Sequence, residues 1–296
     1  MSKPAERRLA GRVGTGRQTR RNLHRVHPIE RLRYVARASG DASSMLVREA
    51  ASALAGFSDD PAALVTACRR LVDRHPRTAP VWWLAARVLA SDQPAREAWS
   101  ATDELDEDPT PNAVADALPE EASVLVLGWP ELIAPALARR GDVDVYVVDA
   151  FDAGSGLVRA LERAGTEATL VEERGVGAAA ASVDVVLIDA VGAGIDGLVA
   201  IAGSRAAAAV ARHMGRSVWG VLGVGRVLPD RLWDAYLARL NEDEDPWDAP
   251  YELVPLDLFD AVIGPDGAME PAVGVRVTDC PPAPELLKSV DSLGAR

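Results

Sequence analysis

Four aspartates are the residues of this sequence best placed to do chemistry, because each stands in a stretch that follows an apolar run. They are Asp149, Asp152, Asp189 and Asp196. If the runs are parallel strands, their carboxyl ends share the edge of the sheet where ligands bind in open α/β folds. Clustered carboxylates would hold a cation or a sugar's hydroxyl groups. The alternative is solvated loop carboxylates, and because the histidines lack metal-ligand spacing we expect no metal.

A second set of residues is suited to an anion. Gly203 and Ser204 open a helix, with Ser204 placed to cap its first turn, and a helix N-terminus attracts anions. Arg205 and Arg226, the latter in the motif GVGR, would add positive charge, although two glycines in a turn also serve simply to relax the backbone. The predicted ligand-binding residues are Gly128, Asp149, Gly156, Asp189, Gly203, Ser204, Arg205 and Arg226.

The turn after the first expected strand argues against a nicotinamide cofactor. It contains one glycine, Gly128, where a dinucleotide site needs three in GxGxxG spacing. Gly128 followed later by Asp149 is also similar to methyltransferases, in which an acidic residue holds ribose hydroxyls. Trp129 and Pro130 replace the glycines of that pattern. We therefore expect no cofactor.

Two kinds of element must position these residues. Strands are expected at 123–127, 145–148, 168–171, 184–188 and 218–222, with a last strand near 273–277, and helices at 131–139, 156–164, 203–213 and 229–240. A loop is expected at 189–202. Alternating strands and helices predict a Rossmann-like, doubly wound and mostly parallel sheet. Ahead of it, helical periodicity predicts an N-terminal helical domain.

One helix of that domain begins at Asp60-Pro61, a capping residue followed by a first-turn proline. Cys68 falls in its apolar stripe and is interpreted as structural, since apolar surroundings raise the pKa of a thiol. The predicted division of the chain is a basic arm, a helical domain, an acidic linker, the Rossmann-like domain and a tail, at residues 1–27, 28–102, 103–121, 122–282 and 283–296.

Composition indicates the cellular compartment in which the protein works. With two cysteines, Cys68 and Cys280, a disulfide framework cannot form, which favours a reducing cytoplasm. No apolar run approaches the roughly 20 residues that span a bilayer, and the N-terminus has no signal-peptide pattern. We therefore expect a cytoplasmic protein with no membrane partner.

Charge is divided unequally along the chain. The chain has a net charge of −12. Residues 1–27 have a charge of about +7, so the rest of the chain has a charge of about −19. An acidic body repels nucleic acid, so a role with RNA or ribosomes would depend on this arm. The alternative, which the lack of aromatic residues in the arm favours, is a solvated disordered tail.

The order of several stretches resembles a known family. They are GDASSMLVREAASAL, RHPRTAPV, VDAFDAGSGLVRALERAGTEATLV, VDVVLIDAVGAGIDGLVAIAGS and YELVPLDLFDAVIGPDG, within residues 28–268. The family unites the alpha, beta and delta subunits of translation initiation factor 2B with methylthioribose-1-phosphate isomerase and ribose-1,5-bisphosphate isomerase. The resemblance implies a helical domain joined to a Rossmann-like domain, and assembly as a homodimer or hetero-oligomer.

The resemblance also implies which residues stand at the isomerases' catalytic positions. Gly128 matches their cysteine and Val191 their aspartate. Phe151 matches the arginine of their Glu-x-Arg-Pro turn, and Ala200-Ile201 match their Asn-Lys pair. These replacements cannot exchange protons with a sugar phosphate.

The sequence thus favours a non-catalytic relative that acts by oligomerisation, by binding a partner, or by binding a phosphorylated sugar or nucleotide. One alternative is a sugar-phosphate isomerase with relocated chemistry, in which Asp189 and Asp149 are acid and base and Ser204, Arg205 and Arg226 hold the phosphate. Another is an RNA- or ribosome-associated factor that uses the basic arm.

Overall fold

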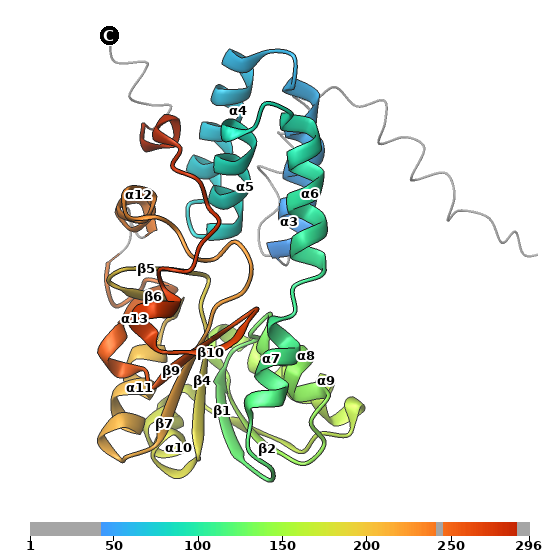
Figure 1. Ribbon diagram of the computed structural model, residues 1–296. Coiled ribbons are helices and arrows are strands. Elements are labelled where there is room, and N and C mark those ends of the chain that lie inside the picture. Colours follow the sequence, from blue (N-terminus) through green and yellow to red (C-terminus); the bar gives the residue numbers. More distant parts are fainter. Residues whose placement is uncertain (1–42, 241–244, 289–296) are drawn as a thin grey trace, which may run out of the picture.

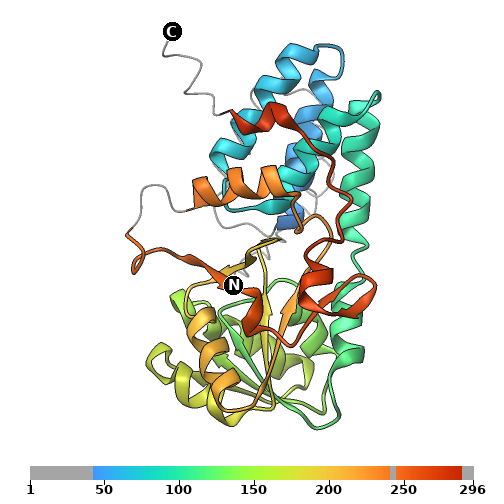
Figure 2. The same cartoon turned by 60° about the vertical axis from the view of Figure 1, so that its left-hand side comes forward.

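The computed structural model describes residues 43–240 and 245–288 (Figure 1). The basic arm at residues 1–27, which carries the nucleic-acid hypothesis, lies outside the described residues. The described chain forms a layer of helices above an α/β unit (Figures 1 and 2).

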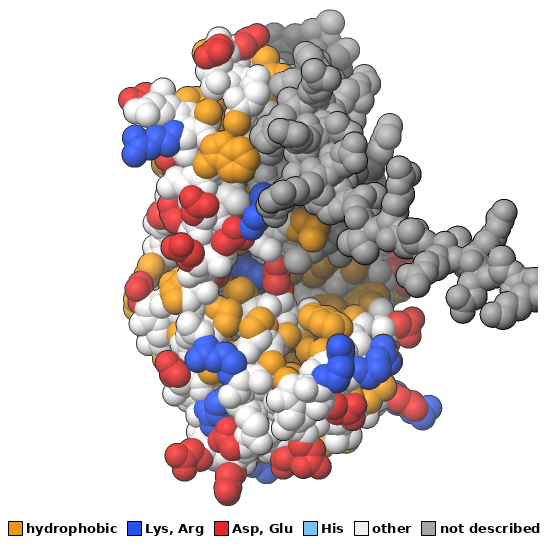
Figure 3. All heavy atoms as spheres, turned by 90° about the vertical axis from the view of Figure 1, so that its right-hand side faces the viewer, with side chains coloured by type: hydrophobic (Ala, Val, Ile, Leu, Met, Phe, Trp, Pro, Cys, Tyr) orange, Lys and Arg blue, Asp and Glu red, His pale blue; other side chains and the backbone are white. Residues whose placement is uncertain are grey.

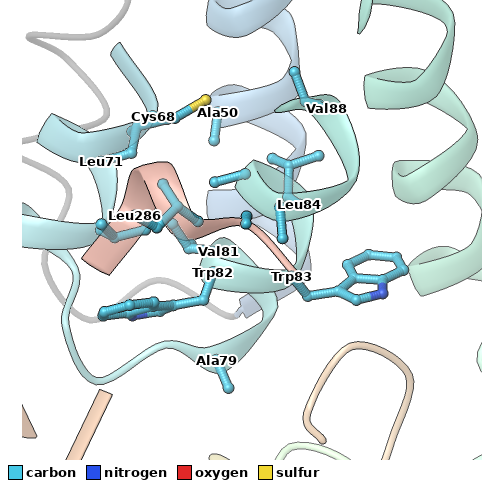
Figure 4. Close-up of a cluster of buried hydrophobic side chains, with 14 of the residues drawn as sticks. Ala50, Cys68, Leu71, Ala79, Val81, Trp82, Trp83, Leu84, Val88 and Leu286 are labelled. Atoms are coloured by element: carbon cyan, nitrogen blue, oxygen red, sulfur yellow. The ribbon is translucent and has the colours of Figure 1, made fainter. Parts of the chain in front are cut away.

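The upper layer packs four helices around one apolar core. The helices are α3 (Ser43–Leu54), α4 (Pro61–Arg74), α5 (Ala79–Ala90) and α6 (Pro94–Asp106). Trp82 and Trp83 at the start of α5 are both fully buried, which anchors this helix in the core (Figure 4). The core therefore holds large aromatic groups that bury much apolar area.

Helix α4 begins as expected. The side chain of Asp60 accepts a hydrogen bond from the N–H of Ala63 at 3.0 Å, and Pro61 occupies the first turn. Cys68 is fully buried among the apolar side chains of this core, and burial raises the pKa of its thiol (Figure 4). The interpretation of Cys68 as a structural residue is consistent with this placement.

The lower unit is the expected doubly wound sheet. Its strand order is β10-β9-β7-β4-β1-β2-β3, parallel except for β10. The strands are β1 (Ser123–Leu127), β2 (Asp144–Val148), β3 (Ala168–Val171), β4 (Val185–Asp189), β7 (Ser217–Val221), β9 (Ala261–Gly264) and β10 (Gly267–Met269). Its helices are α7 (Thr110–Ala117), α8 (Ile133–Ala138), α9 (Gly154–Ala164), α10 (Val176–Ser182), α11 (Ser204–His213) and α13 (Pro271–Gly274).

The winding reverses between β1 and β4. From β1 the chain continues to β2 and β3 on one side, and the later strands β4, β7 and β9 lie on the other. Such a reversal opens a crevice beyond the carboxyl ends of the two central strands. The fold therefore places a crevice beside Gly128 and Asp189, which follow β1 and end β4.

The predicted loop at 189–202 is wrong. This segment forms the hairpin β5 (Gly192–Gly194) and β6 (Gly197–Ile201), and β6 pairs with β8 (Tyr251–Pro255) in a separate antiparallel sheet. Its glycines are required by close packing, since a Cβ at Gly194 would lie 2.4 Å from the Trp233 ring. In sequence, a glycine that makes room for a packed aromatic ring looks the same as a loop glycine. This explains why a loop was predicted here.

One other expectation needs correction. Residues 273–277 do not form a strand, because α13, with a proline at its first position, occupies their start. The segment 103–121, predicted as an acidic linker between the domains, includes the end of α6 and the whole of α7. Ion pairs of Arg48 with Asp106 and of Arg87 with Glu104 offset its negative charge.

Helix α12 (Asp230–Leu240) lies between β7 and β9 in sequence but packs into the upper layer (Figure 1). The ring of its Tyr236 stacks on Trp233 at 5.5 Å and meets Trp82 of α5 edge-on at 6.0 Å. Leu286, near the end of the described chain, is buried in the same core (Figure 4). Residues of both predicted domains thus share one core, and the domain boundaries stay a prediction.

Candidate functional site

A cavity of about 460 Å³ lies at the carboxyl ends of β1 and β4, where the winding reverses. It is within the size range of small-molecule sites. Its lining residues include Leu127, Trp129, Glu131, Asp189, Val191, Ile201, Ser204, Arg226 and Tyr251. Figure 3 shows one face of the molecule, on which hydrophobic side chains gather in a hollowed band between the helical layer and the sheet.

Arg226 forms the centre of the polar wall. Its Nη1 donates to Asp189 Oδ1 at 2.6 Å and to the carbonyl of Ala190 at 2.5 Å, and its Nη2 donates to Glu131 Oε2 at 2.9 Å. The Arg226 side chain is 4% exposed. A buried guanidinium needs such charged and hydrogen-bonded partners. Arg226 is thus held by acceptors of the protein itself.

Asp189 is equally enclosed. Its Oδ2 accepts the N–H of Leu132 at 2.9 Å, and its side chain is 9% exposed. Burial raises the pKa of Asp189 above its ordinary value, and the adjacent Arg226 opposes this rise. The arrangement fixes the loop after β1 against the end of β4.

The start of α11 is capped differently from the prediction. Ser204 is the first helical residue, it is buried, and it makes no side-chain cap. Instead, Oε1 of Glu252 on β8 accepts the N–H groups of Gly203 at 2.7 Å and Arg205 at 3.0 Å. A carboxylate therefore occupies the position in which a helix N-terminus attracts an anion.

Gly128 and Val191, the two positions that the resemblance matches to catalytic residues, have no side chain that could fill such a role. Gly128 has a φ of +62°, and a Cβ there would lie 2.9 Å from Cδ1 of Ile201. Val191 lines the cavity with an apolar side chain. Its N–H donates to the carbonyl of Val199, and its carbonyl accepts the N–H of Ala79. Neither residue can transfer a proton.

Two predicted site residues, Asp149 just after β2 and Gly156 in α9, lie at the start of α9. Asp149 Oδ1 accepts the N–H of Ser155 at 3.2 Å. Gly156 lies under the ring of Trp129, since a Cβ there would be 2.7 Å from that ring. Their local contacts give Asp149 and Gly156 structural roles beside the cavity.

The structure thus brings together three of the predicted side chains. Asp189, Ser204 and Arg226 line the cavity, whereas Arg205 contributes its amide to the Glu252 contact. Asp196 lies in the β5–β6 turn and accepts Trp233 Nε1 at 3.2 Å. The four aspartates therefore do not form one cluster, and the described residues contain no group of three or more His, Cys, Asp or Glu fit to hold a metal.

Sequence reasoning missed Trp129, Glu131, Tyr251 and Glu252. The first two come within three residues after Gly128, just past the end of a predicted strand, so their position was a usable signal. Tyr251 and Glu252 reach the site from β8, some 50 residues after α11 begins, through a strand pairing that no local pattern reveals. Burial raises the pKa of Tyr251.

A neighbouring cavity of about 350 Å³ is bordered by Phe151 and Trp247, both exposed. Phe151 and Asp152 have φ values of +53° and +60°, a strained conformation for residues other than glycine. Glu173 Oε1 accepts the Phe151 N–H at 3.0 Å, which helps to hold this turn. This turn thus presents an aromatic ring beside the second cavity.

Within the residues that the structure describes, no helix has the length and apolar character needed to cross a bilayer. This agrees with the absence of a long apolar run in the sequence.

No protein-family model and no curated protein sequence matches this chain. Solved structures are similar to it. Translation initiation factor 2B from Pyrococcus horikoshii OT3 superposes with a TM-score of 0.70 and 14% identity, over 84% of this chain and 98% of that chain. The tetrameric beta2-delta2 complex of initiation factor 2B from Chaetomium thermophilum gives 0.65 and 16%, over 84% and 92%. The 5-methylthioribose 1-phosphate isomerase of P. horikoshii OT3 gives 0.58 and 13%, over 83% and 85%.

These similarities confirm the resemblance in fold. The chain has the architecture shared by initiation factor 2B subunits and methylthioribose-1-phosphate isomerase, with a helical region followed by a mostly parallel sheet. At these identities the likeness concerns the fold, and function depends on the side chains grafted on it.

Proposed function

We propose that this chain is a non-catalytic relative of the initiation factor 2B subunits that acts by binding. It assembles with other chains and holds a ligand in the strand-end cavity. The strand ends keep their architecture, whereas the groups that would exchange protons with a sugar phosphate are replaced.

One observation carries this proposal. The resemblance matches Gly128 to the cysteine of the isomerases. Gly128 adopts a left-handed conformation, and Ile201 lies in the space that a side chain there would enter. The second implied position is Val191, which has no titratable group. General acid–base catalysis needs a titratable side chain within hydrogen-bond reach of the substrate.

The test is turnover of methylthioribose 1-phosphate and of ribose 1,5-bisphosphate by the full chain. We expect none above a blank without protein. Turnover that Asp189→Asn abolishes would overturn the proposal, because it would identify relocated chemistry.

An isomerase with relocated chemistry is the second candidate, and one observation favours it. Asp189 ends a central strand, lies in the cavity and has a raised pKa, which are features of general acids. Against it, both oxygens of Asp189 accept hydrogen bonds from the protein, and Asp149 caps α9.

The assembly part of the proposal is supported by the tetrameric state of one similar structure. We expect the full chain to form a homodimer or larger homo-oligomer, or to form a hetero-oligomer with a related chain. Sedimentation velocity over a hundredfold concentration range tests this for the chain alone. A homo-oligomer gives a sedimentation coefficient above the monomer value, either rising with concentration or constant when association is tight, and a constant monomeric value excludes self-assembly.

A further inference from the structure

The strand-end cavity has an excess of negative charge. Its charged lining residues among those described are two carboxylates, Glu131 and Asp189, and one guanidinium, Arg226. The formal charge of this trio is −1. Just outside the lining, Glu252 adds a further carboxylate at the start of α11.

These charges are unequally accessible. Arg226 and Asp189 are buried and bound to each other, with side chains 4% and 9% exposed. The Glu131 side chain is 31% exposed, and its contact with Arg226 uses Oε2. A ligand that enters the cavity therefore meets the carboxylate of Glu131 more readily than the guanidinium of Arg226.

The position suited to an anion is already filled. Glu252 accepts the amides of Gly203 and Arg205, and these are the groups that a phosphate at this helix would use. A phosphate would have to displace Glu252 or approach it, and like charges at short range repel. The cavity thus disfavours phosphorylated ligands.

The remaining wall suits an aromatic body. Trp129 is 51% exposed and lines the cavity, and its ring lies against Gly156 of α9, where an added Cβ would be 2.7 Å from the ring. Leu127, Ile188 and Ile201 supply apolar lining. An apolar wall with one accessible polar group is typical of sites for small organic molecules.

We propose that this cavity binds a small aromatic amine, with its protonated amino group paired with Glu131 and its ring against Trp129. This inference rests on the proposed function and deepens it, since it names the ligand class of the non-catalytic site. Charge-assisted hydrogen bonds and aromatic contacts provide the affinity.

Three compounds with one ring and different head groups provide the test. Tryptamine is a cation, tryptophol is neutral and indole-3-acetate is an anion at neutral pH. Isothermal titration calorimetry on the full chain should give affinities that fall in this order, with about 10-fold between the first and the last. Inorganic phosphate should produce no heat of binding.

Two variants separate the charge from the ring. Glu131→Gln should weaken tryptamine about 10-fold and leave tryptophol unchanged, whereas Trp129→Ala should weaken both. Matched controls are Glu162→Gln, at an exposed position on α9, and Trp99→Ala, an exposed tryptophan on α6. Neither control should change any of the three affinities.

Indole-3-acetate that binds as tightly as tryptamine would overturn the inference, and so would no binding of any compound at millimolar concentration. Tryptamine binding that survives Glu131→Gln would do the same. These failures are distinguishable from failure of the proposed function, which is detected as sugar-phosphate turnover and does not depend on amine binding.

Discussion

Oε1 of Glu252 lies 2.7 Å from the backbone nitrogen of Gly203 and accepts its N–H at the start of α11. The contact joins the separate three-stranded sheet to a helix of the main sheet. It also provides the negative charge that a helix N-terminus favours, so the protein itself completes what resembles an anion site.

Replacing Glu252 should expose this site. Glu252→Ala leaves the amides of Gly203 and Arg205 without their acceptor, which costs about 1 kcal/mol of stability. Inorganic phosphate should then raise the Tm of the variant but not that of the wild type, in thermal unfolding with sulfate-free buffers. Equal stabilisation of both proteins would show that Glu252 does not block the position.

Much of the parallel sheet was predictable, because each strand has a strong local signal. Val124, Leu125 and Val126 are buried on both faces of β1, so the strand appears as a continuous apolar run. The β5–β6 hairpin lacked this signal, since Gly192 and Gly194 admit the rings of Tyr236 and Trp233. That requirement lies in a helix far along the chain.

The candidate site was predictable only in part for the same reason. Asp189 follows a strand and could be placed by its position. The pairing of Asp189 with Arg226 joins residues 37 apart, and the Glu252 contact with Gly203 joins residues 49 apart. Sequence patterns put residues at an edge of the sheet, whereas these ion pairs and caps depend on side-chain packing.

Gly128 should resist substitution more than an ordinary left-handed glycine. Gly128→Ala incurs the left-handed backbone cost of about 1–2 kcal/mol and forces Ile201 to another rotamer for about 1 kcal/mol more. Gly165→Ala is the matched control, because Gly165 has a φ of +91° with open space around it. Urea denaturation measures both variants.

The rotamer contribution can be isolated by adding Ile201→Ala. In a double-mutant cycle, this change should remove the extra cost of Gly128→Ala. Equal losses for Gly128→Ala and Gly165→Ala, with no coupling to Ile201, would contradict the crowding at Gly128.

The raised pKa of Asp189 predicts a definite pH dependence. In the unfolded chain Asp189 ionises near its ordinary value of 3.8, and in the folded chain it keeps its proton to higher pH. The unfolded state then binds fewer protons, so wild type loses stability relative to Asp189→Asn as pH rises above about 4. Urea denaturation of both proteins from pH 4 to pH 7 measures the difference.

Glu104 provides a control of opposite sign. Arg87 lowers the pKa of Glu104 below its ordinary value of 4.5, so the stability from this pair is present above that pH and is lost as pH falls. The wild type should therefore gain stability relative to Glu104→Gln as pH rises. The same trend for both variants would contradict the burial effect at Asp189.

The hairpin should depend on Gly194. A Cβ there would lie 2.4 Å from the ring of Trp233, which is fully buried and cannot move aside, so Gly194→Ala should cost about 2–3 kcal/mol. Gly215→Ala, at a φ of +68° with open space, should cost about 1 kcal/mol. Chemical denaturation gives both values, and similar losses would refute the packing argument.

The central claim is that this chain does not turn over sugar phosphates, and a single-turnover experiment tests it most directly. The full chain is held in excess over methylthioribose 1-phosphate or ribose 1,5-bisphosphate, and phosphorus NMR follows the substrate. We predict that the substrate signal persists unchanged, because Gly128 and Val191, which the resemblance matches to proton-transferring residues, have no titratable side chain. Conversion to a ketose phosphate by the wild type, abolished in Asp189→Asn, would contradict the claim.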